Sequence, residues 1–102
     1  MENAYLNDQY FEAKIQLRPF DRKIYDFIIK QVSKRKDTFI TKEVWCKTGI
    51  DLYLTNQRFA RSLGKKLKDN FRGELKITRT LHSRDRLRSR LKYRATILFR
   101  LK

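Results

Sequence analysis

The segment from Leu54 to Lys68 constrains the fold of this chain most strongly. Its large apolar residues recur every four positions, the spacing of one face of an α-helix, and they are Phe59, Leu63 and Leu67. A second set recurs at spacings of three and four and is entirely cationic: Arg58, Arg61, Lys65 and Lys68. No acidic residue lies within the segment. The pattern predicts a helix that packs on a core and presents a cationic face to a polyanion.

The charge of the whole chain indicates the same kind of partner. Residues 55–102 hold 16 basic and 3 acidic residues, whereas residues 1–54 hold 10 and 8, so nearly all of the net charge of +15 lies in the second half. Solubility alone requires neither this sign nor this asymmetry, and both are typical of proteins that bind polyanions. With 102 residues, the chain is long enough for a single domain with one modest core.

Three segments alternate apolar and polar side chains, which predicts strands. The first covers residues 11–17 and is ended by Pro19. The other two, residues 74–81 and 91–101, are separated by a polar, arginine-rich stretch that we interpret as the tip of a hairpin.

Two further helices are predicted before the basic one. Asp21 is a suitable N-cap for the first, whose apolar residues also follow a helical spacing. Thr41 would begin a short second helix with Trp45 facing the core, and Gly49 would end it in a left-handed conformation. The basic helix would then begin at a cap formed by Thr55 or Asn56.

This order of elements resembles the winged-helix (winged helix-turn-helix) DNA-binding proteins. Residues 41–50 are similar to the first helix and turn of that motif, and residues 84–90 are placed like its wing. Residues 45–67 also resemble the winged-helix tail of phage and plasmid primase-helicases, through the run Leu54-Thr55-Asn56-Gln57-Arg58-Phe59-Ala60-Arg61-Ser62-Leu63. The resemblance implies an α+β fold of three helices and a C-terminal hairpin wing over residues 21–102. An arm and an additional N-terminal strand would occupy residues 1–20.

What this resemblance implies is binding to double-stranded DNA, by a transcriptional regulator or a replication accessory factor. The recognition helix would place these side chains nearest to base edges: Asn56, Gln57, Arg58 and Arg61. Lys65 and Lys68 would contact phosphates. The wing would lay its arginines on the backbone or in the minor groove, namely Arg84, Arg86, Arg88 and Arg90. The small, basic chain also suits a viral or plasmid reading frame.

Other partners stay open at this stage. An acidic protein or peptide could bind a groove or the edge of the strand at residues 11–17. That strand could instead pair with the wing sheet, or with a second chain in a homodimer. RNA could replace DNA, because a basic hairpin can recognise the shape of a duplex. Tyr53, which we expect in an exposed turn, could touch a sugar or a phosphate.

Enzymatic function is not expected. The sequence holds no Ser/His/Asp set and no phosphate-binding glycine loop. Glu74-Leu75-Lys76 resembles an element of some metal-dependent nucleases, but Asp69 is the only further carboxylate nearby. One cysteine (Cys46) and one histidine (His82) exclude a Cys/His zinc site within one chain, so we expect no metal and no cofactor.

The expected location is the cytoplasm, with association to the nucleoid if the ligand is DNA. A single cysteine allows no internal disulfide and fits a reducing compartment. No apolar run approaches the length of about 20 residues that spans a bilayer, and no signal peptide opens the chain, so we expect no membrane partner.

Overall fold

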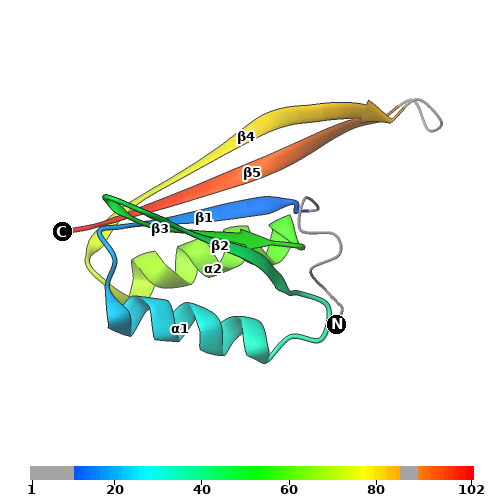
Figure 1. Ribbon diagram of the computed structural model, residues 1–102. Helices are drawn as coiled ribbons and strands as arrows, with labels where there is room; N and C mark the ends of the chain where they lie inside the picture. Colours follow the sequence, from blue (N-terminus) through cyan, green and yellow to red (C-terminus); the bar gives the residue numbers. More distant parts are fainter. Residues whose placement is uncertain (1–10, 86–89) are drawn as a thin grey trace.

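The computed structural model describes residues 11–85 and 90–102, and the side chains of residues 11–79 and 93–102. The elements in chain order are β1 (Ala13–Arg18), α1 (Arg22–Ser33), β2 (Ile40–Cys46), β3 (Gly49–Leu54), α2 (Gln57–Asn70), β4 (Gly73–Asp85) and β5 (Arg90–Leu101). The strands form one sheet in the order β2-β3-β1-β5-β4. Both helices lie against the same face of this sheet, and within the described part of the chain the other face carries no helix (Figure 1).

The strand predicted at residues 11–17 exists and pairs with the C-terminal hairpin, which was one of the alternatives, but it lies at the centre of the sheet. β1 pairs antiparallel with β3, where Ile15 lies opposite Leu52, and parallel with β5, where Ile15 lies opposite Ile97. The backbone of β1 is hydrogen-bonded to β3 on one side and to β5 on the other, so β1 has no free edge for a partner strand. The exposed edges of the sheet are β2 and β4.

The predicted three-helix winged-helix fold is wrong, because residues 41–50 form no helix. They belong to the antiparallel hairpin of β2 and β3, in which Cys46 pairs with Gly49. A Cβ atom on Gly49 would overlap the carbonyl oxygen of Leu17 on β1, so glycine is needed for close strand packing and not for a helix cap. A register shift between Ile40 and Lys42 interrupts the pairing at the start of β2. The sequence of this strand therefore lacks the regular alternation that would have predicted it.

The predicted wing is also part of the main sheet. β4 and β5 pair antiparallel along their length, from Gly73 opposite Leu101 to Asp85 opposite Arg90, and β5 continues the sheet through β1. The hairpin was therefore predicted correctly as a hairpin, but it is not a separate wing beside a helical bundle. The molecule has two layers, one of helices and one of sheet (Figure 1).

The core lies between the helices and the sheet. α1 buries Ile24, Ile28 and Val32, and α2 buries Phe59, Ala60, Leu63, Gly64 and Leu67. The predicted apolar face of α2 is thus confirmed, as are the N-caps: Asp21 accepts the Ile24 N–H, and Asn56 accepts the Phe59 N–H. The expectation that Trp45 faces the core is wrong, since 62% of its surface is exposed on β2.

Candidate nucleic-acid interface

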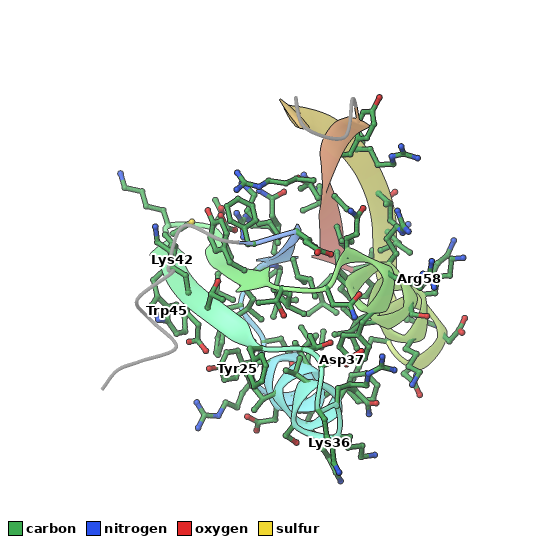
Figure 2. All side chains as sticks on the ribbon, turned by 90° about the vertical axis from the view of Figure 1, so that its right-hand side faces the viewer. Tyr25, Lys36, Asp37, Lys42, Trp45 and Arg58 are labelled. Atoms are coloured by element: carbon green, nitrogen blue, oxygen red, sulfur yellow. The ribbon has the colours of Figure 1, made fainter. Side chains whose placement is uncertain are left out.

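The cationic face predicted for α2 is present and lies away from the sheet. Arg58, Lys65 and Lys68 are exposed and Arg61 is half-buried. None of the four forms an ion pair with another residue of the described regions. Figure 2 shows Arg58 pointing outward from α2, on the opposite side of the view from Trp45 and β2. The amphipathic spacing in the sequence therefore translates directly into a solvent-exposed face of uncompensated positive charge.

The first turn of α2 is tied to the β4–β5 hairpin. Gln57 donates a side-chain hydrogen bond from Nε2 to the carbonyl oxygen of Tyr93 at 3.2 Å, and its Oε1 accepts one from Nη1 of Arg61 at 3.4 Å. Arg79 lies opposite the buried Ala95 in the sheet register, so it points to the same side of the sheet as α2. Arg79 of the hairpin thus shares one side of the molecule with the cations of α2.

Arg79 adds an aromatic contact to this side. Its guanidinium carbon lies 4.6 Å from the centre of the Tyr93 ring, a cation–π arrangement that holds a planar, charged group on the hairpin. We found this pair only in the structure. The alternation of the two strands could have placed both residues on one face, but not in contact, because the strand register was unknown.

Two of the residues predicted to contact bases are bonded within the protein. Asn56 caps α2 through the Phe59 N–H at 3.0 Å, and its Nδ2 lies 3.4 Å from the carboxylate of Asp37. Gln57 bridges Tyr93 and Arg61, as described above. Contact of either amide with a base would require breaking these bonds, whereas the exposed cations of α2 need no such rearrangement.

The four arginines predicted for the wing stay a prediction. Arg84 and Arg90 lie on β4 and β5, where Arg84 pairs with Leu91 and Arg90 with Asp85 in the register. Their side chains lie outside the described set. Arg86 and Arg88 lie outside the described residues altogether.

Tyr53 lies on β3 and not in a turn, which corrects its expected position. It is half-buried on the helix-free face of the sheet, between Lys14 and Lys42. The nuclease alternative gains no support from the geometry, because the Glu74 carboxylate lies 3.8 Å from Nζ of Lys102 in an exposed pair. Within the described regions, no group of three or more His, Cys, Asp or Glu residues could hold a metal ion.

Comparison with known families identifies the ancestry of this fold. Residues 10–101 match the family model described as NMD3, second domain. The chain belongs to the NMD3 family. With this match and the two-helix, five-stranded fold, the resemblance to winged-helix proteins and to primase-helicase tails is wrong, and so are the expectations of a transcriptional regulator and of a viral or plasmid origin.

None of the curated proteins matches this NMD3 second domain. In the part of the NMD3 domain that the structure describes, no helix is long and apolar enough to cross a membrane.

Proposed function

We propose that this domain binds double-stranded nucleic acid, chiefly through its phosphates, by the cationic face of α2 and the adjoining β4–β5 hairpin. The observation that carries the proposal is the charge of α2. Its solvent face presents Arg58, Arg61, Lys65 and Lys68 without an ion-paired acid among the described residues. Asp69 near the end of α2 is the one acid of this helix and forms no ion pair with these cations, and such an excess of positive charge favours a polyanionic ligand over a solvated surface.

The proposed binding is general with respect to sequence. Asn56 and Gln57, the amides best suited to bond adenine, are engaged inside the protein. Arginine and lysine side chains that meet phosphates fix the position of a duplex without reporting its sequence. Duplex DNA is the ligand expected from the sequence, and duplex RNA offers the same phosphates, so both belong in the test.

The test is a fluorescence-anisotropy titration with labelled DNA and RNA duplexes of about 25 base pairs, at salt concentrations from about 50 to 200 mM. The variant is Arg58→Glu with Lys65→Glu. Its matched control is Lys23→Glu with Lys30→Glu, which makes the same charge change, at the same seven-residue spacing, on exposed positions of α1. The two variants therefore differ in the location of the charges and not in their number.

We expect the α2 variant to weaken duplex binding by about tenfold or more, and to reduce the slope of log K against log salt by about two units. The α1 control should lose much less affinity and keep its slope. Equal losses in the two variants would show that only the overall charge matters and would overturn the proposed interface.

The edge strand β2 favours a second candidate function, addition of an extended peptide. Trp45 is 62% exposed and Phe39 is 57% exposed beside an edge whose outer backbone groups have no neighbouring strand among the described residues. An acidic peptide would complement the positive charge of the domain. Because Trp45 is the only tryptophan, its emission reports the event: binding of an acidic, extended test peptide should shift it to the blue, and an unchanged spectrum would exclude this mode.

We also infer a cytoplasmic location, where nucleic acid is accessible to the domain. The single Cys46 is an exposed free thiol, which fits a reducing compartment. Localisation of a tagged chain in its own cells would test this inference.

A further inference from the structure

The face of the sheet that carries no helix has its own cross-strand row of side chains. Lys42 on β2 lies opposite Tyr53 on β3, which lies opposite Lys14 on β1. Lys14 in turn lies opposite Thr96 on β5, and Thr96 opposite Thr78 on β4. Directly opposite residues point to the same face, so this row crosses all five strands with one aromatic ring between two lysines.

Tyr53 is the centre of this row. The Nζ atoms of Lys14 and Lys42 lie 5.7 Å and 5.6 Å from the centre of its ring. The ring of Phe11 meets the Tyr53 ring edge-on at a centroid distance of 4.7 Å. The guanidinium carbon of Arg94 lies 3.8 Å from the centre of the Phe11 ring. Two aromatic rings and three cations are thereby gathered at one end of the open face.

The acids that the structure describes on the open face are already engaged, and unpaired cations remain beside them. Asp51 is paired with Arg18, and Glu74 lies 3.8 Å from Nζ of Lys102. Among the described residues, the following open-face cations form no ion pair: Lys14, Lys42, Lys76 and Arg100. Figure 2 shows Lys42 pointing away from the helical layer.

We propose that this open face is a second site, which binds single-stranded nucleic acid. Sheet faces that combine aromatic rings with basic side chains bind unpaired bases by stacking and their phosphates by charge. Lys14 and Lys42 extend from strands two apart, roughly 10 Å at the backbone, so their ammonium groups reach phosphates on either side of a base that contacts Tyr53. In the bound state the ammonium groups of Lys14 and Lys42 leave the Tyr53 ring and bind phosphates. A base then stacks on the ring.

The ligand is single-stranded because the bases of a duplex are stacked on one another and cannot offer their faces to the Tyr53 ring. The site is separate from the α2 face, which lies in the other layer of the molecule (Figure 1). The inference therefore does not depend on the duplex proposal, and each can fail while the other stands.

The experiment is an anisotropy titration with labelled oligo-dT and oligo-U of about 12 nucleotides. Tyr53→Ile removes the ring and keeps a residue that favours strands. Lys14→Gln with Lys42→Gln removes the two flanking charges. Two double variants remove the same number of charges elsewhere: Arg58→Gln with Lys65→Gln on α2, and Lys23→Gln with Lys30→Gln on α1. Thermal unfolding of each variant confirms that it is folded.

We expect Tyr53→Ile and the Lys14/Lys42 variant each to weaken single-strand binding by about tenfold, and the two control variants to weaken it by no more than about threefold. Binding of both probes supports the site. Binding of oligo-U without binding of oligo-dT also supports it and assigns the site to RNA. Failure of both probes to bind, or equal losses in all charge variants with none from Tyr53→Ile, overturns it. Amide chemical-shift mapping gives an independent check, with changes expected at Lys14, Lys42 and Thr96 and not along α2.

Discussion

The two helices cover the same face of one sheet, yet they differ in both of their surfaces. α1 meets the sheet with large side chains such as Ile28, and its solvent face carries an opposed pair in which Arg22 lies 3.7 Å from Asp26. α2 meets the sheet partly through Ala60 and Gly64, and its solvent face is cationic. Lys23 and Lys30 on α1 are also exposed and form no ion pair with the described residues, so the two helices differ in the density of their cations and not in the presence of cations. The contrast therefore suggests that the surface of α2 is shaped by a ligand.

We expect the largest loss of stability from a substitution on the side of α1 that faces the sheet. Ile28 is fully buried, so Ile28→Ala removes buried apolar volume and leaves a cavity. We expect a loss of about 2–5 kcal/mol in the free energy of unfolding, measured by chemical denaturation. Lys30→Ala on the exposed face of the same helix should change it by less than about 0.5 kcal/mol. A small effect of Ile28→Ala would mean that α1 is only loosely packed.

The corresponding test of α2 adds volume instead of removing it. A Cβ atom on Gly64 would lie 2.8 Å from Cγ2 of Ile97 and 3.2 Å from Cδ1 of Leu75. Gly64→Val should therefore cost about 1–3 kcal/mol by forcing α2 away from the β4–β5 hairpin. Ser62→Val, on the exposed side of the same helix, should cost well under about 1 kcal/mol. Equal stabilities of the two variants would contradict the close approach of helix and sheet.

Removal of the N-cap should destabilise the two helices to a similar extent. Asp21→Ala and Asn56→Ala each remove a side-chain acceptor from a helix N-terminus and should each cost about 1 kcal/mol in thermal or chemical unfolding. Asn56→Ala should leave the affinity for duplex DNA unchanged where the protein is folded. If that affinity falls about tenfold, Asn56 is a base contact and its role is not only structural.

The smallest effect concerns the loop that follows α1. The Arg35 guanidinium, which bonds both carboxylate oxygens of Asp37 at 3.0 Å, holds the pKa of Asp37 below its ordinary value of 3.8. Because the folded state binds this proton less readily than the unfolded chain, the stabilising contribution is present above pH 3.8 and is lost as the pH falls through the lowered pKa. Arg35→Gln should raise the pKa of Asp37 in an NMR titration, and Lys34→Gln should leave it unchanged.

The sequence predicted the elements whose signals are local. The spacing of Phe59, Leu63 and Leu67 located α2, and the caps Asp21 and Asn56 located the starts of both helices. The alternation of β5 and its pairing with β4 were also evident, because a hairpin joins neighbouring segments. The cationic residues that α2 contributes to the candidate interface followed from the helical period alone.

The parts that sequence analysis missed depend on contacts between distant segments. Val44, Trp45 and Gly49 fit a short helix as well as two strands joined by a tight turn, and only pairing with β3 and β1 decides between them. The parallel pairing of β1 with β5 leaves no local pattern, so the sequence left open whether this strand joins the C-terminal hairpin or offers an edge to a partner, and it did not indicate the central position. The position of Tyr53 between two lysines likewise arises from the registers of three strands.

The central position of β1 has a consequence for the order of assembly during synthesis. Ala13 is made early, yet its parallel partner Ala95 belongs to the last strand. Until β5 has left the ribosome, one side of β1 stays unpaired, and contacts of such long sequence separation form slowly. A nascent chain already bears the cationic α2 before this sheet can close. The central strand of the sheet is therefore completed only at the end of synthesis, and until then its open side is exposed to wrong pairing.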